Sequence, residues 1–520
     1  MEHNTTTLHC DLCVIGNGYA GINAVNAASH YLPKGSTIVC IARNEDWGGH
    51  WPTQYKYCTL HQPFEGYAVG DHKWPLARTY DQRSHLATRG EILNYFKHCI
   101  NEIKVKKGIE IIELWGYEYR GHNVKSKKVN IMAYPLFNNN TIHKINVVAN
   151  RLIKGNGYDL KVKAPFVFAE SKNVNDKFHS LTANDVLLPA TNALMLFSKD
   201  KDKPIYIIGS GKTAVDAMNA MSTELGSRVT NRMYCISGHG TYFMVRRGRA
   251  ANANIKGMLM YNGSNEKDVF NFWNKEGFFH SPFPDPESHM NAICSKAEVE
   301  QIKQVLSPAN EKIFKAHLID INYNNSNPQT LELILKDLRK NRVGTIMKHE
   351  IPIGSFIINC TDQYAEHVSK HEPIVSEDNL VLSPQTCLHG GGPSCEFLTH
   401  AWYLGTLDQF WRELPRVILE HDRKEKWGLQ CFFQDFVSIR IAGQHLPKEV
   451  VDASGWGTLT RASFLPPNFD QLVAHMKKVL PHRYTDKNLF VEVKNDNIRK
   501  KKVGGGFGGV IGIGVDRSRL

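Results

Sequence analysis

The sequence predicts an α/β fold with two Rossmann-like dinucleotide-binding domains, the second of which is inserted into the first. Residues 10–21 (CDLCVIGNGYAG) and residues 205–216 (IYIIGSGKTAVD) each read as an apolar strand, a Gly-x-Gly turn and the start of a helix. Such a unit is typical of a dinucleotide-binding domain. The later apolar runs Leu331–Leu335 and Ser355–Cys360 are expected to be strands that return to the first domain.

Length and composition indicate a globular protein. The chain has 520 residues, of which 42% are apolar and 22% charged, so it is long enough to bury a large core. No run of about 18 apolar residues is present, so no membrane-spanning helix is expected. The N-terminus lacks the charged and apolar regions of a secretory signal, which favours a cytoplasmic protein.

The net charge of +12 favours anionic partners, nucleotides included. A basic surface that only aids solubility is the alternative. Basic and aromatic residues are not interleaved as in nucleic-acid-binding motifs, so no nucleic acid partner is expected.

Residues 1–160 are expected to form the first part of the first domain. Its expected elements, in chain order, are a buried strand at Leu12–Ile15, a helix at Tyr19–Tyr31, a parallel strand at Ser36–Ala42, a long loop at 44–86, a helix at Thr88–Ile103 and a strand-rich meander at 110–150. The loop is rich in Trp, Tyr, His and Pro, and a loop of this length inside a compact domain is usually functional.

The second domain is expected over residues 161–320. Its expected elements are a strand at Ile205–Ile208, a helix from Thr213, a strand at Met233–Ser237 and mostly helical, irregular structure over 250–315. Residues 321–497 are expected to complete the first domain, with a helical segment at 397–421. Residues 498–520 form a basic, glycine-rich tail that is expected to be flexible or to lie on the surface.

Residues 16–21 (GNGYAG) match the fingerprint G-x-G-x-x-G. Gly16 permits the tight turn, Gly18 lets the backbone approach a pyrophosphate, and Gly21 lets helix and strand pack closely. A glycine turn in another α/β fold is the alternative. The second strand ends at Ala42-Arg43 rather than at the acidic residue that usually binds ribose hydroxyls, and the nearest acids are Glu45 and Asp46.

Residues 209–214 (GSGKTA) form the second turn, with alanine at the third glycine position, which the fingerprint allows. A P-loop would require glycine at position 206, where Tyr206 stands, so an ATPase is not expected. Arg246 and Arg247 are candidates to clamp a 2′-phosphate and so to select NADPH over NADH. An ordinary basic loop is the alternative.

The cysteines predict neither a disulfide framework nor a metal site. The chain has 11 cysteines at irregular spacings, and no His/Cys spacing resembles a closed zinc site. Cys10 and Cys13 form a C-x-x-C pair, but they stand in or beside the first strand, where small buried residues are common. A structural pair is therefore favoured over a redox pair.

The order strand, GNGYAG, helix, strand and then residues 46–51 (DWGGHW) resembles that of the flavin-containing monooxygenases. These proteins carry an acidic residue and a Gly-Gly-x-Trp motif after the second strand of the FAD domain. Residues 209–216 are similar to their NADPH-binding turn, and residues 358–362 (INCTD) stand where the family has an Ala-Thr-Gly strand. Residues 58–63 (CTLHQP) and 211–217 (GKTAVDA) resemble a less characterised branch of FAD/NAD(P)-binding oxidoreductases within this group.

The resemblance covers roughly residues 8–420 and implies FAD and NADPH as cofactors, with O2 and a small molecule as substrates. In such enzymes NADPH passes a hydride to FAD, and the reduced flavin then forms a C4a-hydroperoxide that transfers one oxygen atom. His61 and Gln62 stand where the family has an asparagine near the flavin, and they are the candidate catalytic residues. A structural role for His61 is the alternative. The candidate cofactor-binding residues are Gly16, Gly18, Tyr19, Ala20, Gly21, Arg43, Gly49, His50, Trp51, Gly209, Gly211, Lys212, Thr213, Ala214, Arg246, Arg247, Thr361 and Asp362.

Two departures from the family pattern keep other functions open. Asn173 and Asn175 hold the Phe and Gly positions of the family's F-x-G-x-x-x-H linker, and residues 360–362 read Cys-Thr-Asp instead of Ala-Thr-Gly. The alternatives are an NAD(P)H-dependent flavin reductase or oxidase without oxygen transfer, and a non-catalytic flavin-binding interaction protein. The substrate stays open, and an oligomer is compatible with the sequence.

Overall fold

A computed structural model describes residues 6–81, 83–136, 144–156, 164–168, 174–187, 197, 202–246, 251–307, 311–339, 342–361, 374–384, 392–407, 447–448, 451 and 469–481. Arg247, Asp362, the helical segment expected at 408–421 and the tail at 498–520 lie outside these residues.

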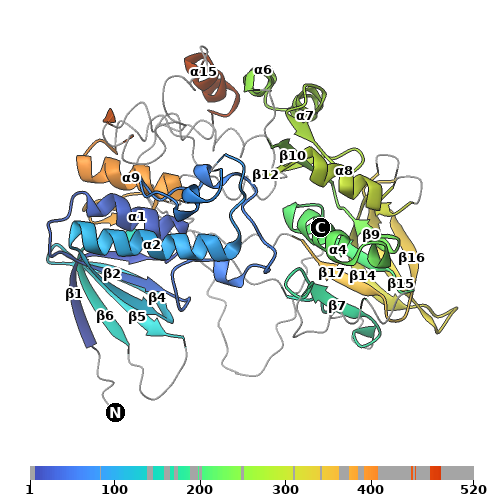
Figure 1. Cartoon of the computed structure of the whole chain (residues 1–520), viewed down its shortest axis with the longest axis horizontal. Coiled ribbons are helices and arrows are strands. Elements are labelled where there is room, and N and C mark those ends of the chain that lie inside the picture. Colours follow the sequence, from blue (N-terminus) through green and yellow to red (C-terminus); the bar gives the residue numbers. More distant parts are fainter. Residues whose placement is uncertain are drawn as a thin grey trace.

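The first unit is built on a seven-stranded sheet with the order β3-β2-β1-β6-β5-β4, and β18 pairs with β6 (Figure 1). Strands β3, β2, β1, β6 and β18 are parallel to one another. Strand β5 pairs antiparallel with β6, and β4 pairs antiparallel with β5. The strands are β1 (Thr6–Ile15), β2 (Thr37–Ala42), β3 (Glu110–Trp115), β4 (Tyr117–Lys125), β5 (Lys128–Pro135), β6 (Ile145–Lys154) and β18 (Val381–Leu382). Leu12 to Ile15 in β1 are buried, as the apolar run predicts.

Three helices lie together on one side of this sheet (Figure 1): α1 (Tyr19–Ser29), α2 (Arg89–Lys107) and α9 (Gly392–Leu404). Every residue of α1 after Tyr19 is buried, because the helix lies between the sheet and α9. Thr88 and Glu91 form a capping box at the start of α2, and Gly108 ends it in the left-handed conformation. The loop between β2 and α2 contains three short 3₁₀ turns, η1 (Trp51–Thr53), η2 (Phe64–Gly66) and η3 (Pro75–Arg78).

The second unit is built on five parallel strands with the order β13-β9-β8-β17-β7. These are β7 (His179–Thr182), β8 (Ile205–Ile208), β9 (Met233–Ile236), β13 (Ile313–Phe314) and β17 (Phe356–Asn359). The helices of this part of the chain are α4 (Lys212–Leu225), α5 (Ser227–Thr230), α6 (Ala251–Met260), α7 (Glu266–Lys275) and α8 (Lys296–Val305). The strands β8 and β9 confirm the predicted positions, and the Gly-x-Gly turn lies between β8 and α4.

Two small sheets accompany the second unit. One has the order β11-β10-β12, formed by β10 (Thr241–Val245), β11 (Phe279–His280) and β12 (Ser288–Cys294). The other is an antiparallel meander of β14 (Ala316–Tyr323), β15 (Thr330–Asp337) and β16 (Ile346–Pro352). The region 250–315 therefore contains more strand than expected, because its strands β11 and β12 form a sheet with β10.

The structure differs from the expected boundary at residue 320. The runs Leu331–Leu335 and Ser355–Cys360 do form strands, but both belong to the second unit, where β17 lies between β8 and β7. Among the described residues that follow β17, β18 pairs with the first sheet, beside β6. All four residues of β17 are buried, and an apolar run alone does not specify which of two sheets buries it.

A late helix also contacts the second unit. Helix α15 (Phe469–Val479) contacts α6, and the Nε2 atom of His475 lies 2.7 Å from the backbone oxygen of Tyr261. Within the described ranges, no helix has both the length and the apolar character needed to cross a membrane.

Candidate functional site

The first glycine turn joins β1 to α1 at the carboxyl end of a parallel strand. Gly16 has a φ of +104°, which favours glycine, and its N–H donates to the oxygen of Ile41 at 2.9 Å. A Cβ atom on Gly21 would lie 2.0 Å from the oxygen of Gly16, so only glycine fits where α1 crosses the turn. Tyr19 and Ala20 form the first turn of α1. Gly18 is the N-cap, no side chain caps the helix, and its first turn holds no acidic residue.

The Gly-Gly loop after β2 packs directly on this turn. The N–H of Gly48 donates to the oxygen of Asn17 at 2.8 Å, and the Asn17 side chain donates to the oxygen of Asp46 at 2.5 Å. A Cβ atom on Gly49 would lie 2.6 Å from the Cα of Gly18. The two backbones can approach this closely only because both residues are glycines.

Asn156 also lies at this turn, although it is not among the residues predicted from the sequence. It follows β6, and its backbone nitrogen lies 3.4 Å from the position of a Cβ on Gly16. Its side-chain Oδ1 is buried and has no hydrogen-bond partner in the described part of the chain. Buried acceptors are normally hydrogen-bonded. A hydroxyl group of a ligand bound at this turn would donate to the Asn156 oxygen. The signal was the pair Gly155-Asn156 at the end of an apolar strand.

Aromatic side chains enclose the loop that follows. Tyr19 stacks on Tyr67 with ring centroids 3.9 Å apart, and Trp51 donates through Nε1 to the Tyr67 hydroxyl at 2.9 Å. His50 stacks against Trp51 at 5.2 Å, and burial lowers the pKa of His50 to about 4. Among the expected cofactor residues, His50, Trp51 and Tyr19 are thus brought together around one aromatic cluster.

Arg43 lies apart from this cluster. Its guanidinium donates to Glu118 of β4 at 2.7 Å, and about half of its side chain is exposed. Arg43 follows directly on β2, so it stands at the end of the second strand as expected, but its described partner is an acidic residue of the same sheet.

The second glycine turn repeats the geometry of the first. Gly209 has a φ of +117°, and a Cβ there would lie 2.7 Å from the oxygen of Cys360. Thr361 follows on β17 and is fixed by hydrogen bonds from its N–H and hydroxyl to the side-chain oxygen of Asn359, at 3.1 and 2.7 Å. The structure therefore places Thr361 beside the second turn, not beside the first.

The start of α4 also lacks a cap. Gly211 is the N-cap, no side-chain hydrogen bond caps the helix, and its first turn contains no acidic residue. A Cβ on Gly211 would meet no atom within 4 Å, so this side of the turn is open. Thr213, in the first turn of α4, is half-buried. Ala214, which occupies the position of the third glycine, is fully buried.

The charged residues next to α4 form a buried network. Lys212 forms ion pairs with Asp216 and, at 3.2 Å, with Glu298. Arg246 pairs with Glu298 at 2.8 Å. Burial alone would raise the pKa of Glu298, but the charges of Lys212 and Arg246, with hydrogen bonds from Ser295, lower it to about 2. For Lys212, burial opposes the charged form, yet the Asp216 and Glu298 carboxylates raise its pKa.

His61 lies where the long loop of the first unit meets the second unit. Arg246 Nε donates to the backbone oxygen of His61 at 3.0 Å, and the Ile293 N–H lies 3.4 Å from His61 Nδ1. Since Nδ1 accepts, the proton of the neutral ring is on Nε2. Burial, followed by the charges of Lys212 and Arg246, lowers the pKa of His61 to about 4. Gln62 donates to the oxygen of Gly66 at 3.0 Å.

Further contacts of the same loop join the two units. Tyr55 donates to Asp216 Oδ2 at 2.7 Å, and Tyr57 donates to the oxygen of Ala183 at 2.9 Å. Asn184 donates to the oxygen of Thr53 at 3.1 Å. The seam is our name for these contacts of Tyr55, Tyr57 and Thr53 together with those of His61. The loop of residues 46–62 thus contacts the first glycine turn at one end and the helix of the second turn at the other.

The residues that follow β9 lie near the second turn, whereas Arg246 lies elsewhere. Ser210, between the two glycines, is 3.0 Å from the hydroxyl of Thr241, so residues 237–241 border the turn. His239 in this segment lies 3.1 Å from Glu287. Arg246 is at the end of β10 in another sheet and is engaged by Glu298 and His61. The structure therefore brings Arg246 to the seam rather than to the end of β9.

Cys10 and Cys13 are not poised for redox chemistry. Burial raises the pKa of Cys10 to about 12 and raises that of Cys13 as well, so neither thiolate forms near neutral pH. Among the described residues, no cluster of three or more His, Cys, Asp or Glu side chains could hold a metal ion.

Fold and site together define a protein with two Rossmann-like units whose glycine turns are connected by one loop. No protein-family model matches the chain. Uncharacterized proteins of Mycobacterium tuberculosis and Mycobacterium bovis are 32% identical to it over 101 residues, which is 18% of this chain and 18% of each relative. The match thus covers less than a fifth of those relatives.

Solved structures with a similar fold include flavin and nicotinamide enzymes. The FAD-bound cadaverine monooxygenase DfoA of Erwinia amylovora is 13% identical, with 78% of this chain and 94% of that chain covered and a TM-score of 0.46. The NADP+-bound cyclohexanone monooxygenase of Rhodococcus is 12% identical, with 92% and 98% covered and a TM-score of 0.46. The bacillithiol disulfide reductase of Bacillus cereus is 11% identical, with 77% and 100% covered and a TM-score of 0.43.

Proposed function

We propose that this protein is an FAD-dependent, NADPH-using monooxygenase that acts on a small molecule. The observation that carries the proposal is the connection of two glycine turns by one loop. Each turn lies at the carboxyl end of a parallel strand and leads into a helix without a side-chain cap. Within residues 46–62, Gly48 contacts the first turn at Asn17, and Tyr55 contacts α4 at Asp216. Two dinucleotides bound at these turns would both border that loop.

The residues at each turn suit a dinucleotide. Uncapped N–H groups at the start of α1 and α4 are donors for a pyrophosphate, and the absence of acidic residues from both first turns avoids repulsion. Gly16, Gly18, Gly49 and Asn156 would hold FAD, and residues 209–214 would hold NADPH. When bound, the flavin supplies hydride acceptance from NADPH and activation of O2.

His61 is the side chain in this loop that best suits a role next to the reacting groups. Its low pKa keeps the ring neutral from pH 5 upward, and its Nδ1 is engaged by the Ile293 N–H. His61 therefore provides an Nε2–H donor whose charge does not change in the working pH range. The buried rings of Trp51 and Tyr55, with the half-buried ring of Tyr67, exclude water from this part of the loop.

The test is reduction of the bound cofactor under anaerobic conditions. The purified full chain is loaded with FAD, and its visible spectrum is followed after addition of NADPH. We expect bleaching of the flavin absorbance, since hydride transfer requires both turns to be occupied. A chain that binds no FAD, or that binds FAD but is not reduced by NADPH or NADH, would contradict the proposal.

Readmission of air then separates oxygen transfer from oxidase activity. With a panel of amines, sulfides and ketones, we expect at least one substrate for which less than half of the NADPH consumed appears as hydrogen peroxide. Replacing His61 by alanine should increase the peroxide fraction several-fold, whereas the matched replacement of His122 in β4 should leave it unchanged. One peroxide per NADPH with every compound would assign the protein to the oxidases instead.

A further inference from the structure

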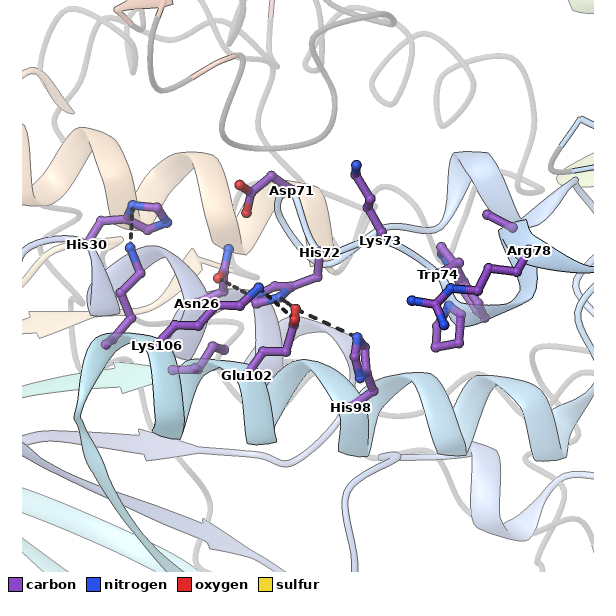
Figure 2. A pocket seen from close by; sticks show the side chains of 14 residues that line it. Asn26, His30, Asp71, His72, Lys73, Trp74, Arg78, His98, Glu102 and Lys106 are labelled. Carbon is purple, nitrogen blue, oxygen red and sulfur yellow. Dashed lines mark hydrogen bonds and ion pairs between the residues drawn. The ribbon is translucent and has the colours of Figure 1, made fainter.

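A cavity of about 800 Å³ lies on the first unit, between α1, α2 and the loop at residues 71–78 (Figure 2). Asn26 of α1 and His30, the C-cap of that helix, form one wall. The opposite wall is formed by residues of α2, namely His98, Glu102, Ile103, Lys106 and Lys107. Asn26 comes eight residues after the N-cap Gly18, which corresponds to about 12 Å along the helix. The cavity is therefore separate from the glycine turn, and its volume is that of a site for a small molecule.

The wall of the cavity carries an excess of positive charge. Its lysine and arginine side chains are Lys73, Arg78, Lys106 and Lys107, and its carboxylates are Asp71 and Glu102. Histidines 30, 72 and 98 line it as well. Such a set from three separate chain segments favours an anionic ligand.

Glu102 does not neutralise the whole set, because it is already engaged by its own neighbours. Its carboxylate contacts Lys106 at 2.6 Å, His72 at 2.7 Å and His98 at 3.7 Å, as the dashed lines in Figure 2 show for the two histidines. The hydrogen bonds from Lys106 and His72 lower the pKa of Glu102 to about 2. Glu102 thus orders the side chains of Lys106, His72 and His98 along one wall.

Lys73 and Arg78 have no comparable partner. Neither forms an ion pair with another described residue. Lys106 and Lys107 also stabilise the C-terminus of α2, where cations are favoured, but Lys73 and Arg78 come from the loop and have no helix end to serve. Arg78 ends η3, which begins at Pro75, and its side chain points toward the cavity in Figure 2.

The wall of the cavity around Asn26 is polar and held by hydrogen bonds. Asn26 is 1% exposed, its Oδ1 lies 3.0 Å from His72 Nε2, and its Nδ2 donates to Glu396 at 3.3 Å. His72 therefore has a partner at each ring nitrogen, Glu102 on one side and Asn26 on the other. A wall held by buried hydrogen bonds is preorganised for a ligand and loses little entropy on binding.

We propose that this cavity binds a small molecule that carries a phosphate group, through Lys73 and Arg78. A dianionic phosphate monoester would balance the excess of lysine and arginine over carboxylates in the wall, and a guanidinium binds two phosphate oxygens at once. The proposal does not depend on the proposed function, because the cavity shares no residue with either glycine turn.

The test is calorimetric titration of the full chain with inorganic phosphate and pyrophosphate. FAD and NADP+ are present at one equivalent each per chain, so that the glycine turns are occupied and little free cofactor phosphate competes for the cavity. We expect dissociation constants below about 1 mM and at least a tenfold weakening in the double variant Lys73→Met, Arg78→Met. Both side chains are exposed, so the variant should fold, which circular dichroism checks. Asp71→Asn should strengthen binding, because it removes a negative charge from the wall.

Lys125→Met is the matched control, since Lys125 lies at the end of β4, outside the cavity lining. The affinity of the Lys125→Met variant for phosphate should equal that of the unmodified chain. Absence of binding at 10 mM phosphate would overturn the proposal, and so would binding that the double variant retains. If the chain takes up neither FAD nor NADP+, the proposed function fails, but dependence of phosphate binding on Lys73 and Arg78 still assigns this cavity.

Discussion

Glu396 is a buried carboxyl group that pairs with no lysine or arginine within the described residues. The Nε2 atom of His400 lies 4.0 Å from its Oε1, but burial lowers the pKa of His400 to about 3, so this ring is neutral at higher pH. Glu396 is fully buried in α9, accepts from Asn26, and its Oε2 has no described partner. Burial raises its pKa well above the usual value. The folded protein therefore keeps the proton at a pH where the unfolded chain has released it, so stability decreases as pH rises from about 4.5 toward the folded pKa.

We expect Glu396→Gln to remove this pH dependence, because the neutral amide keeps an acceptor toward Asn26. The variant should gain stability relative to the unmodified chain as pH rises, by about 1.4 kcal/mol for each unit of the pKa shift. Thermal unfolding between pH 4.5 and 8 measures this. An exposed residue, Glu110, serves as the control, and a stability difference that is the same at every pH would contradict the assignment of a raised pKa.

At the scale of elements, the packing of α1 on its turn decides whether the first unit can hold a dinucleotide. A methyl group on Gly21 would lie 2.0 Å from the oxygen of Gly16, which is backbone and cannot move without shifting α1. We expect Gly21→Ala to cost about 3 kcal/mol of unfolding free energy and to abolish FAD uptake. Denaturant unfolding and flavin absorbance measure the two effects.

Gly90 in α2 provides the matched control for that substitution. A Cβ there would meet no atom within 4 Å, and alanine favours a helix. Gly90→Ala should leave FAD uptake unchanged and stability equal or higher by up to about 1 kcal/mol. Equal effects of the two substitutions would mean that close packing at Gly21 is not the cause.

At the scale of the whole molecule, the seam holds the two units together through the loop of residues 46–62. Tyr55 donates to Asp216, which also pairs with Lys212, so one hydroxyl of the first unit enters the charged network of the second. Tyr55→Phe should cost about 2 kcal/mol, since the lost hydrogen bond reaches a charged and buried acceptor. It should also slow flavin reduction by NADPH.

Stopped-flow reduction and thermal unfolding of Tyr55→Phe measure these effects, with Tyr134→Phe in β5 as the control. If Tyr55→Phe destabilises the chain but reduction proceeds at the original rate, the seam has a structural role only. If neither quantity changes, the hydrogen bond between the two units does not contribute.

The residue types along the chain were enough to predict the local elements of both glycine turns. The strand at Ile205–Ile208 matches β8, and the helix starting near Thr213 begins one residue earlier, at Lys212. The helix expected at Thr88–Ile103 corresponds to α2, which begins at Arg89 and continues to Lys107. These features depend on neighbours in sequence, so pattern and spacing suffice.

The partners of charged side chains could not be predicted in the same way. Lys212 and Arg246 were expected at a cofactor, and the structure pairs both with Glu298 of α8, 86 and 52 positions away. Asn156 was not singled out, because only the packing of β6 against Gly16 brings it to the first turn. Such contacts depend on the arrangement of distant elements, which periodicity does not contain.

By itself, the sequence determined that the chain has two strand-turn-helix units with glycine turns, since turn geometry and strand burial follow from local residue types. Only the tertiary structure decided that β14 to β17 belong to the second unit, that Thr361 lies beside the second turn, and that His61 contacts Arg246 and Ile293. The physical reason is that an apolar strand is stabilised equally well by any sheet that buries it, so its place is decided by the packing of the whole chain.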